Sequence, residues 1–183
     1  MEMEFLLFLQ ELRNPILDFF FSNITLLGNA GIIWIIACIV MLCTKKYRKY
    51  GILFAISLVI CFLVGNIFLK NVIARERPCW VNTDIALLIP NPKDYSFPSG
   101  HSMHSFVGAL SIWYANKKWG IGAFILAGLI AFSRMYLFVH YPTDVIAGIG
   151  IGLLVTFLVH KIAGKRLCIT NYCRLEERHG VLK

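Results

Sequence analysis

Long apolar runs constrain the fold of this chain more than any other feature. Two of them, 119–132 and 145–159, contain no ionisable residue, and two more cover 51–69 and 102–115. A helix of about 20 apolar residues crosses the roughly 30 Å of hydrocarbon in a bilayer. With 58% hydrophobic residues and a mean hydropathy of +0.69, the 183-residue chain is too apolar for an ordinary soluble domain. The sequence therefore predicts an integral membrane protein.

The predicted fold is all-α, a polytopic membrane helical bundle in a single domain that covers residues 1–183. Residues 1–27 are expected to form interfacial or re-entrant helices, because the apolar piece 16–27 is short and contains Asp18. A six-span alternative would need residues 3–27 to cross despite their charges. About five spanning helices are expected, near residues 28–44, 50–70, 100–116, 119–136 and 143–162.

The formal charge of +8 is distributed as in a membrane protein rather than as on a nucleic-acid-binding surface. Four cations lie within 45–49, Lys117 and Lys118 form a second basic loop, and six more Lys or Arg residues follow Val159. The positive-inside rule places these regions in the cytoplasm, so residues 163–183 are expected to be a cytoplasmic tail. The other side then holds six cations: Arg13, Lys70, Arg75, Arg77, Lys93 and Arg134.

The six cysteines do not indicate a disulfide framework or a metal site. Only Cys79 lies in an outer loop, and no spacing matches a zinc site. Cys168 and Cys173 are expected to be unmodified thiols near the inner face, with lipid attachment as the alternative. We therefore predict neither a metal ion nor a cofactor.

Three polar clusters lie at the outer edges of the apolar runs, in segments 70–78, 98–101 and 133–144. Ionisable groups at such depths usually serve a function. The predicted topology brings the clusters to the same side of the membrane, where they could build one anion site. They supply three fixed cations, two histidines and a carboxylate: Lys70, Arg77, Arg134, His101, His140 and Asp144. Cations around an anion, without metal ligands, indicate metal-free phosphoryl chemistry.

Two of the clusters contain the start of a helix. Ser99 is a good N-cap, so the free N–H groups that follow it, with Gly100 allowing close approach, suit phosphate oxygens. His101 in the first turn could then donate a proton to a leaving oxygen. Pro142 suits the first position of the next helix, which places Asp144 near His140.

A hydrogen bond from His140 to this carboxylate would leave the other imidazole nitrogen free to attack phosphorus. The planar fork of Arg134 could meet two phosphate oxygens. Each feature alone is common in proteins without such a site, and their occurrence together on one predicted face favours function.

Other polar residues receive less specific interpretations. Arg75 and Glu76 are expected to form a surface pair, and His104 to be a packed helix histidine. His160 and His179 lie on the inner side and receive no role. The loop between Pro78 and Pro98 could select substrate or merely connect two helices.

The three clusters resemble the signature of the type-2 phosphatidic acid phosphatase family. The first block is Lys, six residues, then Arg-Pro, at 70–78, and the second is Pro-Ser-Gly-His, at 98–101. The third is Ser-Arg, five residues, His, three residues and Asp, at 133–144. The resemblance implies a metal-independent lipid phosphatase whose catalytic bundle is 28–162.

The resemblance also implies a role for each matched residue. His140 would form a phosphohistidine with help from Asp144, and His101 would protonate the leaving group before water hydrolyses the intermediate. The phosphate would be held by Lys70, Arg77, Ser99, Gly100 and Arg134.

By the same resemblance, the expected substrate is a lipid phosphate or diphosphate cleaved at the extracytoplasmic face, with undecaprenyl diphosphate and phosphatidylglycerophosphate as the favoured choices. Phosphatidic acid is a further option. The alternatives are transfer of phosphate to an acceptor lipid and non-enzymatic binding of anionic lipid, while the apolar composition disfavours a vanadate haloperoxidase. The bilayer and the lipid substrate are the expected partners, without nucleic acid or an obligate protein partner.

Overall fold

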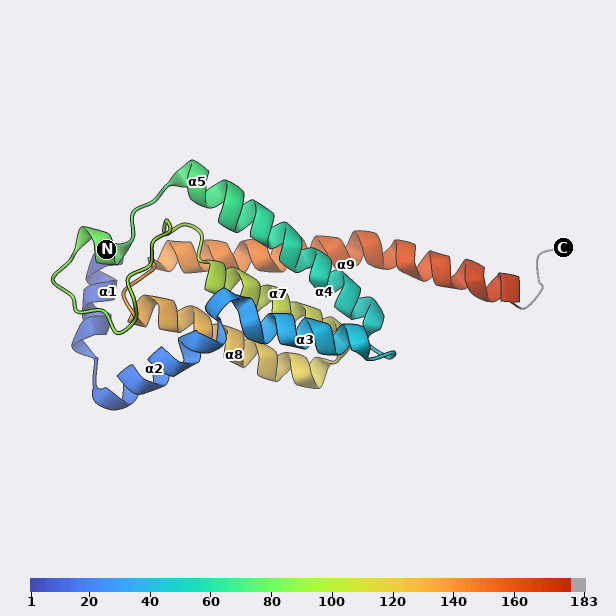
Figure 1. Ribbon diagram of the computed structural model, residues 1–183, viewed down its shortest axis with the longest axis horizontal. Coiled ribbons are helices and arrows are strands. Elements are labelled where there is room, and N and C mark those ends of the chain that lie inside the picture. The colour runs from blue at the N-terminus through green and yellow to red at the C-terminus, as the bar shows by residue number, and fades with distance from the viewer. Residues whose placement is uncertain (179–183) are drawn as a thin grey trace.

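The computed structural model describes the backbone of residues 1–178 and the side chains of residues 1–29 and 31–163. Expectations for Cys168, Cys173 and His179 lie outside the described side chains. The described residues form helices and loops without a strand, which confirms the all-α prediction (Figure 1). In chain order the helices are α1 (Glu2–Glu11), α2 (Pro15–Leu27), η1 (Asn29–Gly31), α3 (Ile32–Cys43), α4 (Arg48–Cys61), η2 (Phe62–Leu69), α5 (Lys70–Ile73), α6 (Pro78–Val81), α7 (Gly100–Ala115), α8 (Lys117–Tyr136) and α9 (Pro142–Arg178).

Three helical segments are long and apolar enough to cross a membrane: Arg48–Val81, Lys117–Tyr136 and Pro142–Ala163. A fourth candidate is the pair α2 and α3, which meet at a bend of 43° and form a broken span or a re-entrant loop. Gly31, with φ of +67°, provides the left-handed residue that this bend requires. The expected span at 100–116 corresponds to α7, whose 16 residues reach only about 24 Å at 1.5 Å per residue.

Helix α7 forms the centre of the bundle and packs most extensively against α8 and α9. Its residues Met103 and Val107 are fully buried, and the indole of Trp34 on α3 donates a hydrogen bond to Ser105 Oγ at 3.0 Å. A Cβ at Gly148 or Gly152 of α9 would lie 2.6 Å from Ser99 O or 2.5 Å from Met103 O. These glycines therefore allow α9 to approach the backbone of α7 closely, as helices in membranes commonly do.

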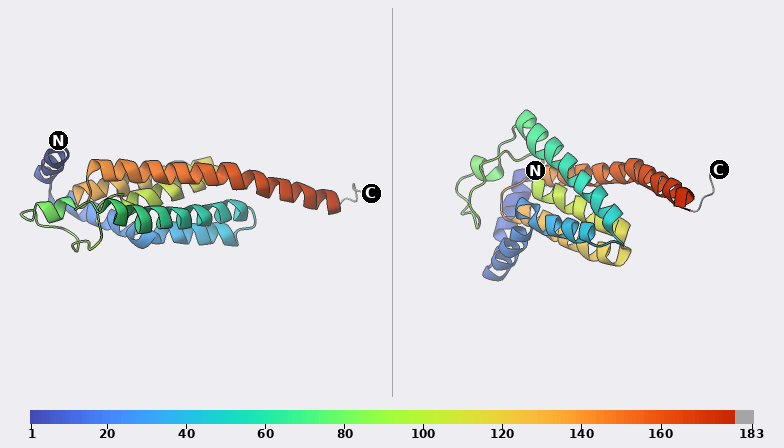
Figure 2. Two further views of the ribbon diagram at one scale, coloured as in Figure 1. Left: turned by 90° about the horizontal axis from the view of Figure 1, so that it is seen from above. Right: turned by 45° about the vertical axis from the view of Figure 1, so that its right-hand side comes forward.

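The two ends of the bundle differ in character. The loop 82–99, the turn 137–141 and the N-terminal helices α1 and α2 gather at one end, and the α3–α4 connection lies at the other (Figures 1 and 2). Helix α9 extends beyond the bundle at this second end. Between the ends, large apolar side chains such as Ile36, Phe68 and Leu154 remain more than half exposed, as membrane-facing residues do.

Candidate active site

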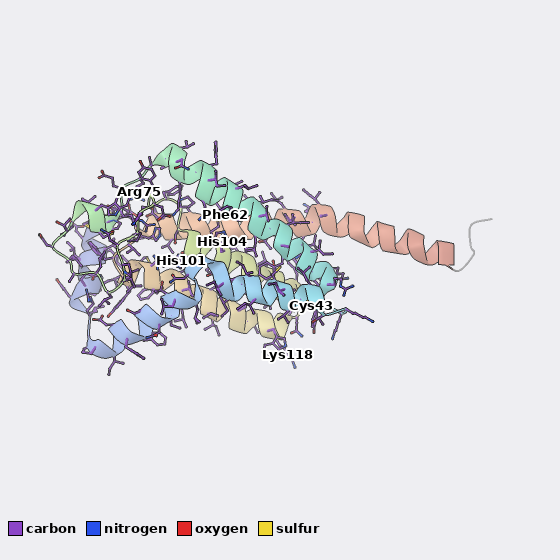
Figure 3. All side chains as sticks on the ribbon, viewed as in Figure 1. Cys43, Phe62, Arg75, His101, His104 and Lys118 are labelled. Atoms are coloured by element: carbon purple, nitrogen blue, oxygen red, sulfur yellow. The ribbon has the colours of Figure 1, made fainter. Side chains whose placement is uncertain are left out.

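The three polar clusters meet in one pocket of about 280 Å³ at the end of the bundle that holds the loops. His101 and Arg75 lie at this end in Figure 3, whereas Cys43 and Lys118 lie at the opposite end. Six predicted site residues line the pocket, namely Lys70, Arg77, Gly100, His101, Arg134 and His140. The other two, Ser99 and Asp144, are fully buried behind it.

His140 lies in the turn between α8 and α9 and is almost completely buried. Its backbone N–H donates to Arg134 O at 3.3 Å, and its Nε2 lies 3.1 Å from Nη1 of Arg77. A guanidinium group can only donate hydrogen bonds, so Nε2 accepts this one and carries the lone pair. The proton of the neutral imidazole is therefore on Nδ1, on the side of Asp144.

Burial, followed by the nearby charges of Arg77, Arg134 and Lys70, lowers the pKa of His140 well below its ordinary value of 6.5. The low dielectric surroundings and the cations both disfavour an additional positive charge on the ring. At neutral pH the imidazole is consequently uncharged, so Nε2 carries no proton and can attack phosphorus once its hydrogen bond from Arg77 is released.

Asp144 accepts its hydrogen bonds in an arrangement that differs from the expected one. Its Oδ2 accepts from Ser96 Oγ at 2.5 Å and from the backbone N–H of Tyr141 at 2.9 Å, but lies 3.6 Å from Nδ1 of His140. Ser96 Oγ is itself 3.4 Å from Nδ1. The two shorter bonds hold the carboxylate oxygen slightly away from the ring, so the expected direct hydrogen bond is replaced by a longer contact beside the serine hydroxyl.

The guanidinium group of Arg77 is fixed against the turn that carries His140. It is 2% exposed and donates to Val139 O at 2.8 Å and to Asp94 O at 2.6 Å. Arg134, which is 4% exposed, donates from Nη1 to Thr25 Oγ1 of α2 at 2.5 Å. Its buried Nε has no hydrogen-bond partner among the described residues. A buried guanidinium donor left unpaired is costly, so an anion in the pocket would relieve this cost.

Asp94 in the loop before α7 is a site residue that the sequence interpretation missed. Its carboxylate forms ion pairs with Lys70 and, at 2.7 Å, with Nη2 of Arg77. Burial tends to raise the pKa of Asp94, but the hydrogen bond and charge of Lys70 and the charge of Arg77 outweigh it and lower the value to about 2. Its anionic oxygens therefore lie against two of the cations expected to hold phosphate, and the 79–97 loop does more than connect helices.

The start of α7 has the predicted cap. Ser99 Oγ accepts from the N–H of Ser102 at 3.4 Å, and the helix begins at Gly100. A Cβ at Gly100 would come within 3.2 Å of the Asn66 side chain, which also lines the pocket. His101 Nε2 is 2.9 Å from Asn29 Oδ1. Asn66 was missed in the sequence, although a lone amide in an apolar run is a signal that could have identified it.

Arg75 does not form the expected surface pair with Glu76. It donates instead to Asp144 Oδ1 at 2.6 Å and to Glu2 Oε2 at 2.7 Å, while Glu76 is exposed. The backbone turns at Ala74, which has a φ of +47° and directs Arg75 back toward α9. This left-handed residue ends α5 and takes Arg75 away from the expected surface position.

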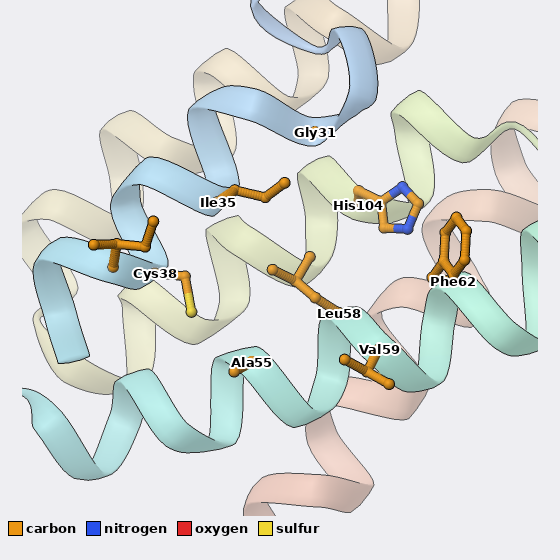
Figure 4. A pocket seen from close by; sticks show the side chains of 9 residues that line it. Gly31, Ile35, Cys38, Ala55, Leu58, Val59, Phe62 and His104 are labelled. Carbon is orange, nitrogen blue, oxygen red and sulfur yellow. The ribbon is translucent and has the colours of Figure 1, made fainter.

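An apolar pocket of about 430 Å³ adjoins the polar one, between α3, α4 and α7 (Figure 4). His104 is half-buried and lines both pockets, so it is not simply a packed helix histidine. Ile35, Ile39 and Val59 at the apolar pocket are about half exposed, which opens it toward the surroundings of the bundle. Its lining is Gly31, Ile35, Cys38, Ile39, Ala55, Leu58, Val59, Phe62 and His104.

Known proteins are similar to this chain in sequence and in fold. The chain is 40% identical over 127 residues to an undecaprenyl-diphosphatase of Sulfolobus acidocaldarius, a match that covers 69% of this chain and 61% of that relative. It is 34% identical over 162 residues to phosphatidylglycerophosphatase B of Bacillus subtilis, covering 81% of this chain and 76% of the relative.

A solved structure and a family description agree with these relatives. The crystal structure of a transmembrane PAP2-type phosphatidylglycerolphosphate phosphatase from Bacillus subtilis superposes with a TM-score of 0.74 at 30% identity, covering 90% of this chain and 85% of the other. Residues 46–168 match the PAP2 superfamily, and this range contains all three polar blocks. The chain is therefore a membrane protein of the PAP2 superfamily.

Proposed function

We propose that this protein hydrolyses a lipid phosphate or diphosphate through a phosphohistidine on His140. The observation that carries the proposal is the position of His140 Nε2, an unprotonated nitrogen at a pocket lined by Lys70, Arg77 and Arg134. The phosphatase names of the relatives support the same reaction class.

In the first step, Nε2 of His140 attacks phosphorus and a new N–P bond forms while the bond to the leaving oxygen breaks. The imidazole keeps its Nδ1 proton, and Asp144 stabilises the positive charge that develops on the ring. His101, which the negative charge of the bound phosphate favours in its protonated form, gives a proton to the leaving oxygen. The three cations and the N–H groups at the start of α7 balance the charge on the equatorial phosphate oxygens.

In the second step, water attacks the phosphohistidine and the N–P bond breaks. His101, having lost its proton in the first step, accepts one from the water, which restores both histidines. The products are inorganic phosphate and the lipid with one phosphate fewer. Before the reaction, the substrate phosphate replaces the Asp94 carboxylate beside Lys70 and Arg77, since the anions compete for the same cations.

The apolar pocket supports a lipid substrate. It shares Gly31, Phe62 and His104 with the polar pocket, so a phosphate beside His140 would have its chain directed between α3 and α4. A prenyl or acyl chain is apolar and fits such a lining. Undecaprenyl diphosphate and phosphatidylglycerophosphate are the substrates we favour, because relatives are named for activity on them.

The ends of the bundle support an extracytoplasmic site. The basic loop 45–49 and Lys117 and Lys118 lie at the end opposite the polar pocket. By the positive-inside rule we infer that this basic end faces the cytoplasm, which supports a pocket on the outer face and a C-terminal end of α9 inside. The assignment is tested by labelling with an impermeant thiol reagent before and after lysis of spheroplasts. The labelled sites are the exposed Cys43 and, at the other end, the cysteine introduced by Asp84→Cys in the loop.

The test of function is phosphate release by the purified protein in detergent with excess chelator. Undecaprenyl diphosphate, phosphatidylglycerophosphate and phosphatidic acid are compared, with His140→Ala as the control. We expect rapid release from one of the first two lipids, lost in the variant. Labelled phosphate that appears on a second lipid would replace hydrolysis by transfer, and a folded protein that binds these lipids without turnover would contradict enzymatic activity.

A further inference from the structure

Arg75 makes more contacts around Asp144 than a surface residue would. One guanidinium nitrogen, Nη1, donates to Asp144 Oδ1 at 2.6 Å and to Thr143 Oγ1 at 2.7 Å. The other, Nη2, donates to Glu2 Oε2 at 2.7 Å, and the group lies 3.9 Å from the centre of the Tyr141 ring. A planar fork can meet these acceptors and stack on the ring at once, which an ammonium group cannot do.

Asp144 needs a positive partner in this position. Its side chain is fully buried, and a buried carboxylate is costly unless it is paired and hydrogen-bonded. His140 is uncharged at neutral pH, so it does not supply the charge. Apart from that imidazole, Arg75 is the cation within ion-pair distance of Asp144 in the described part of the chain.

Glu2 fixes this arrangement from the N-terminal helix. Its Oε1 accepts from the backbone N–H of Thr143 at 3.0 Å and from the Thr143 hydroxyl at 2.7 Å. Thr143 lies in the first turn of α9, so Glu2 caps the helix that carries Asp144. One carboxylate from α1 therefore holds both Arg75 and the helix start.

The backbone of Arg75 adds a second connection to the same site. Its carbonyl accepts the N–H of Ser96 at 2.8 Å, and the Ser96 hydroxyl in turn contacts Asp144 and His140. Arg75 thus touches the environment of His140 through its side chain and through its main chain, without lining the polar pocket itself.

We propose that Arg75 and Glu2 are positioning residues, which hold the Asp144 carboxylate in its orientation behind His140. The proposal rests on the proposed function, because it assigns a role within that reaction. Neither residue contacts the pocket where the phosphate binds, so their substitution should reduce kcat and leave KM nearly unchanged.

The experiment measures kcat and KM of Arg75→Ala, Arg75→Lys and Glu2→Gln, each normalised to folded protein. We expect kcat to fall about ten- to a hundredfold in Arg75→Ala, less in Arg75→Lys, and about two- to tenfold in Glu2→Gln. Matched controls are Glu76→Gln, next to Arg75 and exposed, and Glu4→Gln, also exposed and in the same first turn of α1 as Glu2. Both controls should keep wild-type kcat.

The pH profile separates positioning from a purely structural role. Without Arg75, the negative charge of Asp144 is no longer balanced beside His140, which favours the imidazolium form. The acid limb of kcat/KM should therefore move to higher pH in Arg75→Ala and not in Glu76→Gln. The other charged groups that face His140 are unchanged by this substitution: Lys70, Arg77, Asp94 and Arg134.

The outcomes distinguish this proposal from the one on which it rests. If His140→Ala retains turnover, the proposed function fails. If His140→Ala is inactive but Arg75→Ala keeps wild-type kcat and pH profile, only the positioning role is overturned. Should Arg75→Ala fail to fold, Glu2→Gln and Arg75→Lys decide, because wild-type kcat in both of them contradicts the proposal.

Discussion

The two adjoining pockets differ in what their residues can recognise. The polar pocket is built from residues of fixed geometry, with Arg77 and Arg134 buried and bonded to backbone or side-chain oxygens. The apolar pocket is larger and its wall residues Ile35 and Val59 are about half exposed. One pocket therefore suits a phosphate held in one orientation, and the other suits a chain of variable length. Substitutions in the polar pocket should therefore change the rate of the reaction, and substitutions in the apolar pocket should change the preference for the lipid chain.

The largest effect should come from His140→Ala, which removes the attacking nitrogen. We expect kcat to fall at least about a thousandfold, because the alanine side chain offers no nitrogen to form the bond to phosphorus. Phosphate release per folded molecule measures the loss. The matched control is His160→Ala, at the opposite end of the bundle, whose activity should stay near that of the wild type. Equal activity of the two variants would contradict the claim that the reaction takes place at His140 in the polar pocket.

Arg134→Ala should have the next largest effect. It removes a cation that lines the pocket and whose buried Nε has no hydrogen-bond partner among the described residues. We expect kcat/KM to fall about a hundred- to a thousandfold. Steady-state kinetics with one lipid phosphate provide the measurement. Lys93→Ala, an exposed cation in the nearby loop, is the control for a change of net charge. A similar loss in both variants would mean that general electrostatic attraction, and not the pocket, governs turnover.

Ala55→Phe tests whether the apolar pocket holds the lipid chain. The added ring should fill part of the apolar pocket and raise KM for a long-chain lipid phosphate about tenfold, with little change for a short-chain one. Ile56→Phe, next along α4 and outside the lining, is the control. If both chain lengths are affected equally, the apolar pocket does not hold the chain.

Asp94→Asn should lower KM, which is a smaller change than the one expected for Ala55→Phe and has the opposite sign. Removing the anion that competes for Lys70 and Arg77 should lower KM by about two- to fivefold. Asp84→Asn in the same loop is the control, since Asp84 is exposed. An unchanged or increased KM would show that Asp94 does not compete with substrate.

The low pKa of Asp94 also predicts how the stability of the folded protein depends on pH. Its pKa of about 2 lies below the value of about 3.9 in an unfolded chain, so its stabilising contribution is complete at neutral pH and is lost as pH falls from about 4 to 2. Thermal unfolding of the wild type should therefore become more sensitive to acid than that of Asp94→Asn. Parallel curves for the two proteins would contradict the ion pairs.

The last prediction concerns the pH at which the imidazole of His140 gains a proton, and it is the smallest of the expected changes. Because burial and the surrounding cations lower its pKa, the imidazole should titrate below pH 6.5, and its nucleophilic form should persist at neutral pH. NMR of ¹⁵N-labelled histidines, with His140→Ala for assignment, measures the midpoint. A midpoint at or above pH 6.5 would contradict the claim that burial and the nearby cations lower the pKa of His140.

The sequence predicted the polar cluster better than its surroundings. Apolar runs and helix-start residues such as Ser99 and Pro142 act locally, so the order of the helices and the convergence of His101, Arg134 and His140 followed from them. Their catalytic roles, and the absence of a metal requirement, stay predictions until the variants and the chelator experiment are measured.

The contacts that were missed depend on chain segments far apart in sequence. Glu2 reaches Thr143 across 141 positions, and Asp94 meets Lys70 through the path of an irregular loop. No periodicity encodes such contacts. The positive φ of Ala74 likewise turned Arg75 from the expected surface position toward Asp144, and nothing in the residue type signals that turn.

The most direct test of the central claim is to trap the intermediate. The protein is mixed with a lipid carrying ³²P in its terminal phosphate, quenched in alkali within a single turnover, and digested for mapping of the label. The account predicts acid-labile label on His140 in the wild type, formed before phosphate is released, and none in His140→Ala. Phosphate release without any protein-bound label at early times, or label on another residue, would contradict it.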